Sequence, residues 1–135
     1  MINLEKAQEL AGKHTILPGT ETLPLEQSLG RVLAEDICAD RDMPPFSRAT
    51  MDGYACRRED LPGPLEVLEI LHAGKIPTRK TGPGECSRIM TGAMVPEGAN
   101  CIIMQEYVDT GPDGKIMFTA PTSDTNIHPR GKDMQ

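Results

Sequence analysis

The first apolar residues of the chain recur at a spacing that places them on one face of a helix: Leu4, Ala7, Leu10 and Ala11. Asn3 precedes them, and its side chain can accept a hydrogen bond from the first turn of a helix. Glu5 falls in that turn, where the helix dipole favours a negative charge. Gly12 is a natural helix stop. The sequence therefore predicts a helix from Asn3 to about Ala11.

The remaining apolar runs are short and lie between turns rich in glycine and proline, a pattern typical of strands. The expected strands are 22–25, 31–39, 65–72, 85–90, 101–109 and 115–119. A helical turn is expected over 25–29 and a hairpin loop over 110–114, whereas 40–50 and 121–135 are expected to be loops. Strands and helices do not alternate, as a doubly wound parallel sheet requires. The expected fold is therefore mainly β (α+β) with an N-terminal helix.

Composition and charge narrow the function classes. Twelve prolines and thirteen glycines make up nearly a fifth of the 135 residues, which is high for a helical bundle. The net charge is −6 and no basic run occurs, so a nucleic-acid-binding groove is not expected. No membrane-spanning segment is expected either, because no run of 18 apolar residues occurs. Glu5 and Glu9 interrupt the N-terminal apolar stretch, unlike in a secretory signal, so a cytoplasmic location is the simplest interpretation.

The four cysteines are widely spaced along the chain: Cys38, Cys56, Cys86 and Cys101. No pair has the C-x-x-C spacing of a zinc or redox motif. We therefore expect them to be reduced and mostly buried as small apolar side chains. A metal site assembled from distant cysteines and His14, His72 or His128 stays open as an alternative, although no spacing supports it.

Asp52 is the first candidate for chemistry. It follows the stiff pair Pro44-Pro45 and directly precedes Gly53, which allows backbone or ligand to come close. A carboxylate held in this way can bind Mg²⁺, position water or orient a cationic or phosphate–metal ligand. The alternative is an Asp-Gly turn in which Asp52 caps its own backbone.

A second candidate follows the strand expected at 85–90. The hydroxyl of Thr91 and the amides of Thr91, Gly92 and Ala93 can form an anion-binding nest, or the segment is a simple turn. Lys75 can supply positive charge to an anion or belong to a solvated loop, and Asp133 is equally open. No phosphate-binding loop, nucleophile elbow or zinc-protease motif occurs.

Several motifs together resemble one enzyme family: 43–46 (MPPF), 51–55 (MDGYA), 88–93 (RIMTGA), 95–100 (VPEGAN) and 130–133 (RGKD). In this order and at these intervals, they are similar to the N-terminal part of the molybdopterin molybdenumtransferases. That family includes bacterial enzymes, the plant insertase and the E domain of gephyrin. One position departs from the family pattern: Ala49 stands where a serine is common, and Thr50 follows it.

The resemblance implies an activity and partners. The substrates would be adenylylated molybdopterin and molybdate, and the enzyme would insert molybdenum and release AMP with Mg²⁺ as the divalent cation. Family members are homodimers whose active cleft lies between the N-terminal β region of one subunit and an α/β domain of the other. The Mg²⁺ ligands would lie mostly outside this chain, which would be an inactive N-terminal segment on its own. The alternative is a β-scaffold that binds a protein partner or an anion without transfer chemistry.

The resemblance also implies roles for particular residues, none of them a metal ligand. The catalytic residues would be Asp52, Thr91 and Asp133. The substrate-binding residues would be Lys75, Thr50 and Gly92.

The family's domain plan places boundaries near residues 46 and 128. Residues 1–46 would supply the helix and strands of an elongated dimerisation-type domain, to which 129–135 return. Residues 47–128 would form an inserted β domain, and the sheets would be irregular, coiled and bifurcated.

Overall fold

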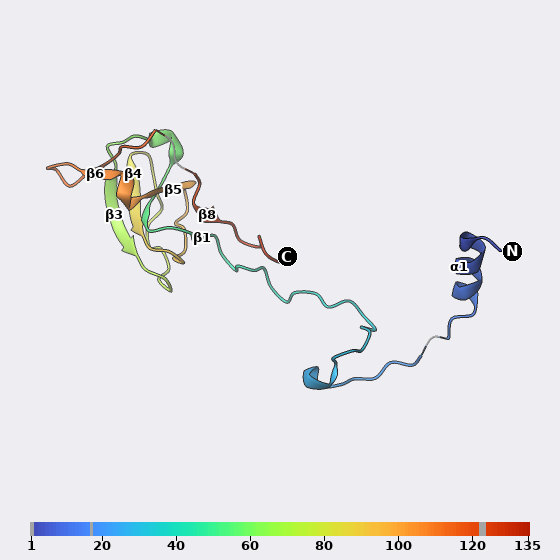
Figure 1. The fold of residues 1–135 in the computed structure, drawn as a ribbon. Coiled ribbons are helices and arrows are strands. Elements are labelled where there is room, and N and C mark those ends of the chain that lie inside the picture. The colour runs from blue at the N-terminus through green and yellow to red at the C-terminus, as the bar shows by residue number, and fades with distance from the viewer. Residues whose placement is uncertain (1, 17, 122–123) are drawn as a thin grey trace. The chain divides into compact units, whose positions relative to one another are not determined.

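The structure is a computed structural model that describes residues 2–16, 18–121 and 124–135 (Figure 1). It divides into two compact units, Met1–Cys38 and Ala39–Gln135. The domain boundaries expected near residues 46 and 128 stay a prediction.

The first unit contains the predicted helix, α1 (Leu4–Lys13). Its start is confirmed, because the Asn3 side chain accepts a hydrogen bond from the Lys6 amide at 2.9 Å. Its end was placed too early. The helix continues through Gly12, and His14 closes it by donating its amide to the carbonyls of the last turn.

The two strands predicted in this unit, 22–25 and 31–39, are wrong. The described residues there form only the 3₁₀ turn η1 (Leu25–Gln27), which confirms the predicted helical turn. A strand exists only where a neighbouring segment completes its hydrogen-bond ladder, and no segment that the structure describes pairs with 31–39. Val32 and Ile37 are 94% and 78% exposed, so the β-branched residues there have no packing partner.

The second unit is built on a four-stranded sheet in the order β3 (Glu66–Leu71), β4 (Glu85–Ile89), β2 (Gly53–Cys56) and β5 (Cys101–Met104). β3 and β4 are parallel, and the other neighbours are antiparallel. The strands predicted at 65–72 and 85–90 are confirmed. β2 lies in a segment for which no strand is predicted. It is covered on both faces, so its residues lack the apolar–polar alternation that reveals a half-exposed strand.

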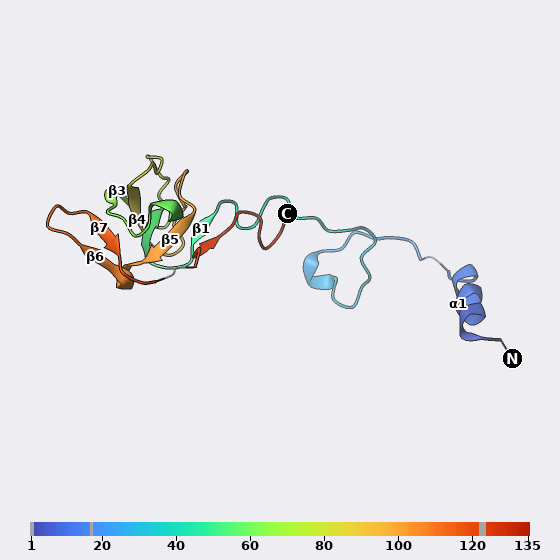
Figure 2. The ribbon, with the colours of Figure 1, turned by 90° about the horizontal axis from the view of Figure 1, so that it is seen from above.

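The single strand predicted over 101–109 is divided. After β5, the exposed residues Gln105 and Glu106 open the 3₁₀ turn η3 (Gln105–Tyr107), and β6 (Val108–Thr110) joins another sheet. β6 pairs antiparallel with β7 (Ile116–Phe118), which confirms the predicted hairpin. In Figures 1 and 2 the loop between them extends away from the rest of this unit. A further 3₁₀ turn, η2 (Arg58–Asp60), follows β2.

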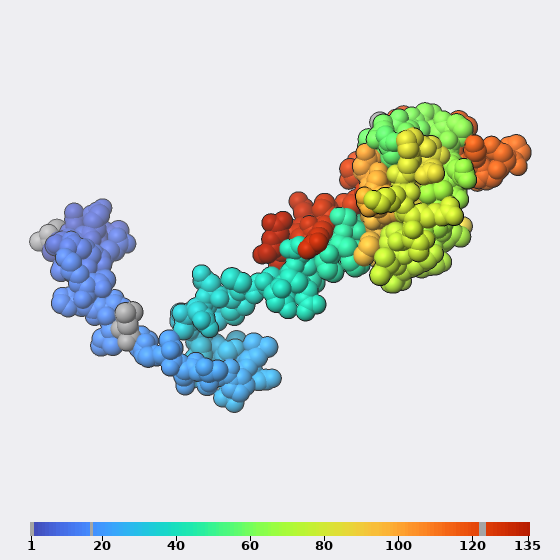
Figure 3. Space-filling view, turned by 180° about the vertical axis from the view of Figure 1, so that it is seen from behind, coloured from blue at the N-terminus to red at the C-terminus, as the bar shows by residue number. Residues whose placement is uncertain are grey.

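Two segments expected to be loops each contribute a short strand. β1 (Arg48–Ala49) pairs antiparallel with β8 (Ile127–His128). Before β1 and after β8 the same two segments meet again, because the Met43 amide donates to the Met134 carbonyl at 2.9 Å. They lie side by side in Figure 3. Strands of two residues are too short to leave a pattern in the sequence.

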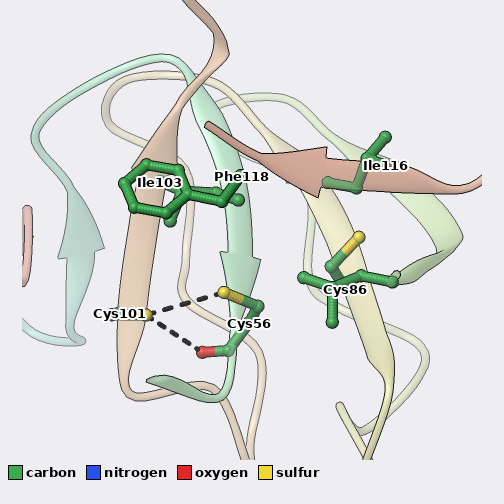
Figure 4. Close-up of a cluster of buried hydrophobic side chains, with 7 residues drawn as sticks. Cys56, Cys86, Cys101, Ile103, Ile116 and Phe118 are labelled. Carbon is green, nitrogen blue, oxygen red and sulfur yellow. Dashed lines mark hydrogen bonds between the residues drawn. The ribbon is translucent and has the colours of Figure 1, made fainter. Parts of the chain in front are cut away.

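Two apolar clusters cover the two faces of the central sheet. One contains Cys56, Leu65, Cys86, Cys101, Ile103, Ile116 and Phe118 (Figure 4). The other contains Ala49, Ala55, Leu71, Ile89, Ala93 and Ile102. Three free cysteines are fully buried, and only Cys38 is exposed, as expected. Burial raises the pKa of the Cys86 thiol to about 12.

Candidate functional site

Strand pairing brings Asp52 and Thr91 together. In the antiparallel pair of β2 and β4, Gly53 lies opposite Ile89, so the start of one strand meets the end of the other. Asp52 directly precedes β2, and Thr91 follows β4 by two residues. The amide N and Oγ1 of Thr91 each donate a hydrogen bond of 2.7 Å to Oδ1 of Asp52. Two of the predicted site residues are therefore in direct contact.

These hydrogen bonds define the charge state of the half-buried Asp52. They lower the pKa of its carboxyl group below the ordinary value, the Thr91 amide contributing most and the Thr91 hydroxyl next. The positive charge of Arg88 lowers it further, by less. Asp52 is therefore ionised at neutral pH. No described residue donates a hydrogen bond to its second oxygen, Oδ2, which is available to a ligand.

Gly53 serves the packing of the sheet at this point. A Cβ atom there would lie 2.0 Å from the carbonyl oxygen of Ile103 on β5, so no other residue fits without moving a strand. The group that comes close to Gly53 is thus the backbone of β5. It fixes the start of β2, and with it the position of Asp52.

The turn after β4 is tied to β1 and does not form an anion nest. Gly92, with a φ of +84°, donates its amide to the Ala49 carbonyl at 2.9 Å. Ala93 donates to the Met90 carbonyl at 3.0 Å, and the Thr91 amide donates to Asp52. All three amides are engaged inside the protein, so the nest interpretation is wrong. The turn instead connects Asp52 with β1.

A hollow of about 310 Å³ opens beside this contact, lined by Arg48, Ala49, Thr50, Thr91, Gly92 and His128. It brings together three of the predicted residues: Thr50, Thr91 and Gly92. Arg48 was not predicted as a site residue, and His128 was named only as a candidate ligand of the alternative metal site. The signals in the sequence were their positions: Arg48 lies between the MPPF and MDGYA motifs, and His128 lies two residues before the RGKD motif.

Asp133 connects to the hollow through His128. Its Oδ1 lies 2.9 Å from His128 Nε2, and its amide donates to the Met43 carbonyl at 2.8 Å. The side chain of Asp133 therefore does not line the hollow itself but contacts the imidazole ring of His128, which does.

Lys75 is engaged elsewhere. Its Nζ donates to the Ile70 carbonyl at 2.8 Å and lies 3.7 Å from Glu69 Oε2. The same carboxylate accepts hydrogen bonds from Thr78 and from the Arg79 amide. Desolvation is the largest single effect and raises the pKa of Glu69, but these hydrogen bonds and the charge of Lys75 together outweigh it and lower the pKa. Lys75 does not line the hollow. Its role as a substrate-binding residue stays a prediction.

The described part of the chain supplies no metal centre of its own. Within residues 2–16, 18–121 and 124–135, no three histidine, cysteine, aspartate or glutamate side chains lie where they could hold a metal ion. Beside the hollow, Asp52 offers one carboxylate oxygen that accepts no hydrogen bond from a described residue. These residues do not fit a complete Mg²⁺ site. Across the same residues, no helix is long and apolar enough to span a membrane.

Comparison with known proteins shows the family. The family described as the MoeA N-terminal region (domain I and II) matches residues 2–135, and the chain belongs to it. Two curated relatives are named molybdopterin molybdenumtransferase. The protein from Haemophilus influenzae is 37% identical over all of this chain and 34% of its own length. The protein from Bacillus subtilis is 37% identical over 86% of this chain and 30% of its own length.

Solved structures agree with this assignment. Two structures of a molybdopterin biosynthesis moeA protein from Pyrococcus horikoshii match at TM-scores of 0.82 and 0.72. They are 37% and 40% identical to this chain, and they cover 97% and 98% of it but 36% of their own chains. The family resemblance and the mainly β (α+β) class are confirmed. The chain spans about a third of the length of these relatives.

Proposed function

We propose that this chain is the N-terminal part of a molybdopterin molybdenumtransferase, which inserts molybdenum from molybdate into adenylylated molybdopterin and releases AMP. Family membership and the names of the curated relatives support the proposal. The observation that carries it is the Asp52–Thr91 contact beside the hollow. An ionised carboxylate fixed by two donors next to an open cavity is a group prepared to meet a ligand.

Asp52 is proposed to contact a group of the substrate that bears a proton, or a water molecule. Its carboxylate would repel the phosphate and molybdate oxygens, so its free Oδ2 has to meet a hydroxyl, an N–H or a cation. We derive no step through Mg²⁺, because the residues of this chain do not complete a site for it. Mg²⁺ stays a prediction of the family resemblance.

Thr91 is proposed as a positioning residue. Its hydroxyl proton points to Asp52, so that proton is not available to a ligand, although the oxygen can still accept. The hydroxyl of Thr50 and the surface at Gly92 are proposed to contact the substrate, since both line the hollow. Asp133 is proposed to act through His128, although the resemblance implied a direct catalytic role.

The remaining expectations belong to the complete enzyme. A homodimer, an active cleft completed by a second subunit and a cytoplasmic location are proposed from the family resemblance. The absence of nucleic-acid and membrane partners is proposed from composition and charge.

The test is an insertion assay on the complete gene product with adenylylated molybdopterin, molybdate and Mg²⁺, followed by AMP release. We expect Asp52→Asn to lower the rate by about 10²–10³-fold, which lies within the range for a positioned acid–base group. Asp109→Asn, an exposed aspartate of β6, is the matched control. Failure of the unmodified protein to release AMP would leave a binding module without transfer chemistry. Unchanged rates in Asp52→Asn would reduce Asp52 to a turn residue.

A further inference from the structure

Two nitrogen-bearing side chains face each other across the small sheet beside the hollow. Arg48 on β1 lies directly opposite His128 on β8, and both line the hollow. Side chains at directly opposite positions of an antiparallel pair lie on the same face, with Cβ atoms about 4.5–5.5 Å apart. A single anionic group of a ligand can therefore meet both.

We infer that Arg48 and His128 form a binding pair for a tetrahedral oxyanion. This inference rests on the proposed function, because it names the side chains that would hold the anionic substrate of that reaction. Two anions in that reaction share this chemistry: molybdate and the phosphate of the adenylate. The guanidinium group offers a fork of N–H donors that matches two oxygens of such an ion.

The charge of Arg48 is available to a ligand. Its guanidinium group makes no ion pair or hydrogen bond with any other described residue. Several other basic side chains are, by contrast, paired with carboxylates, among them Arg31, Arg41, Arg57, Lys75, Lys80 and Arg130. The backbone of Arg48 is held between β8 and Met94, so the side chain projects from a fixed base.

His128 is oriented by Asp133. Because a carboxylate oxygen accepts at 2.9 Å, Nε2 is the donor in that contact, and Nδ1 is the ring nitrogen left for a ligand. When the ring carries both protons, Nδ1 donates to an oxyanion. The Asp133 contact thus fixes the ring while leaving its second nitrogen free.

The hollow suits an anion although the chain carries a net charge of −6. None of its six lining residues is acidic, and the hydroxyls of Thr50 and Thr91 add polar contacts. Two acidic residues contact the lining from outside: Asp52 has one oxygen bound to Thr91, and Asp133 has one oxygen bound to His128. Lys75, the cation first expected here, is held by Glu69 and the Ile70 carbonyl.

The experiment is an NMR titration of the ¹⁵N-labelled 135-residue chain with sodium molybdate, sodium phosphate and AMP in separate series. We expect the amides of Thr50, Thr91 and Gly92 to shift with saturation. Arg48→Gln should weaken binding about tenfold or more, as expected for the loss of a charge-assisted pair. Arg79→Gln, which removes the same charge from an exposed loop, should bind like the unmodified chain. The anion with the highest affinity shows whether the pair binds molybdate or the phosphate of the adenylate.

Two results would overturn the inference: no saturable shift at the hollow with any anion, or equal weakening by Arg48→Gln and Arg79→Gln. An unchanged spectrum away from the hollow shows that each variant is folded. The insertion assay separates this inference from the proposed function. If Asp52→Asn loses insertion while Arg48→Gln keeps full anion affinity, the function stands and the oxyanion pair falls. If Arg48→Gln loses affinity but the complete gene product inserts no molybdenum, the pair stands and the function falls.

Discussion

Thr91 donates both its amide and its hydroxyl to a single carboxylate oxygen of Asp52, each at 2.7 Å. The two residues are 39 positions apart, and the register of β2 and β4 brings them together. The contact both orients Asp52 and keeps it ionised, and it leaves the second carboxylate oxygen free. The arrangement therefore couples the charge of Asp52 to the geometry of the sheet.

Thr91→Val tests whether the hydroxyl acts on Asp52. The variant keeps the amide hydrogen bond and removes the one from Oγ1, so the pKa of Asp52 should rise toward its ordinary value. Thr91 is exposed, so the melting temperature should change little. The insertion rate of the complete gene product should fall about tenfold, which corresponds to a loss of ~1.4 kcal/mol when the hydrogen bond from Oγ1 to Asp52 is removed. Thr110→Val, at an exposed position of β6, is the control. A large loss of melting temperature with intact insertion would mean that Thr91 is a structural residue only.

The lowered pKa of Asp52 predicts a pH dependence of stability. A carboxyl group whose pKa is lower in the folded chain than in the unfolded chain stabilises the fold above its ordinary pKa near 3.8. That contribution is lost as the pH falls through the folded value. Between pH 5 and the acid limit, the free energy of unfolding in urea should therefore fall more for the unmodified chain than for Asp52→Asn. Parallel curves for the two proteins would contradict a carboxylate stabilised by Thr91.

Gly53→Ala tests the close approach of β2 and β5. The new Cβ atom would lie 2.0 Å from the Ile103 carbonyl oxygen, so one strand has to move. We expect a loss of about 1–3 kcal/mol in the free energy of unfolding, the usual range for overpacking. Gly12→Ala is the matched control, because a Cβ there meets nothing within 4 Å. Equal stability of the two variants would show that the backbone at Gly53 relaxes freely.

Local signals in the sequence predicted the elements that depend on local interactions. The Asn3 cap, the hairpin between β6 and β7 and the turns around β3 all follow from residues close together in the chain. The strand expected at 31–39 failed because β-branched residues permit a strand without supplying a partner for it. β2 was missed for the opposite reason. Gly53–Cys56 is covered on both faces, so apolar and polar residues do not alternate along it.

The sequence predicted several residues of the site but not the contacts among them. The family motifs identified Asp52 and Thr91, but the sequence did not show that the Thr91 hydroxyl is used by Asp52. It also did not show that Lys75 is held by Glu69, or that β1 and β8 place Arg48 opposite His128. These relationships depend on the register of distant strands, which local propensity does not determine.

The burial of the cysteines predicts their reactivity. Ellman's reagent should modify Cys38 rapidly in the native chain, because its thiol is exposed. Cys56, Cys86 and Cys101 should react only when the second unit opens, since all three are fully buried. The native chain should therefore show one fast thiol, and the urea-unfolded chain four. Cys38→Ser should abolish the fast phase, and any fast phase left in that variant would contradict the packing of the sheet.

The final prediction concerns the 135 residues alone, which should fold but transfer no molybdenum. The second unit has buried clusters on both faces of its sheet, so we expect it to fold without further residues. Its hollow, by contrast, is open and offers two hydroxyls and two basic side chains to a large polyanion, with the Asp52 carboxylate beside it.

Orientation of reactants can supply roughly 7–11 kcal/mol of barrier lowering, and a single wall of a cleft forfeits most of it. The family resemblance places the opposite wall in an α/β domain, and this chain spans about a third of its relatives. The test supplies the purified 135-residue chain with adenylylated molybdopterin, molybdate and Mg²⁺, and compares its AMP release with that of the Haemophilus influenzae relative. We expect no release above the rate without protein, although circular dichroism should show a folded chain. Turnover at a rate comparable to that of the relative would mean that the complete active site lies within these residues, and the proposed division of the cleft between domains would be wrong.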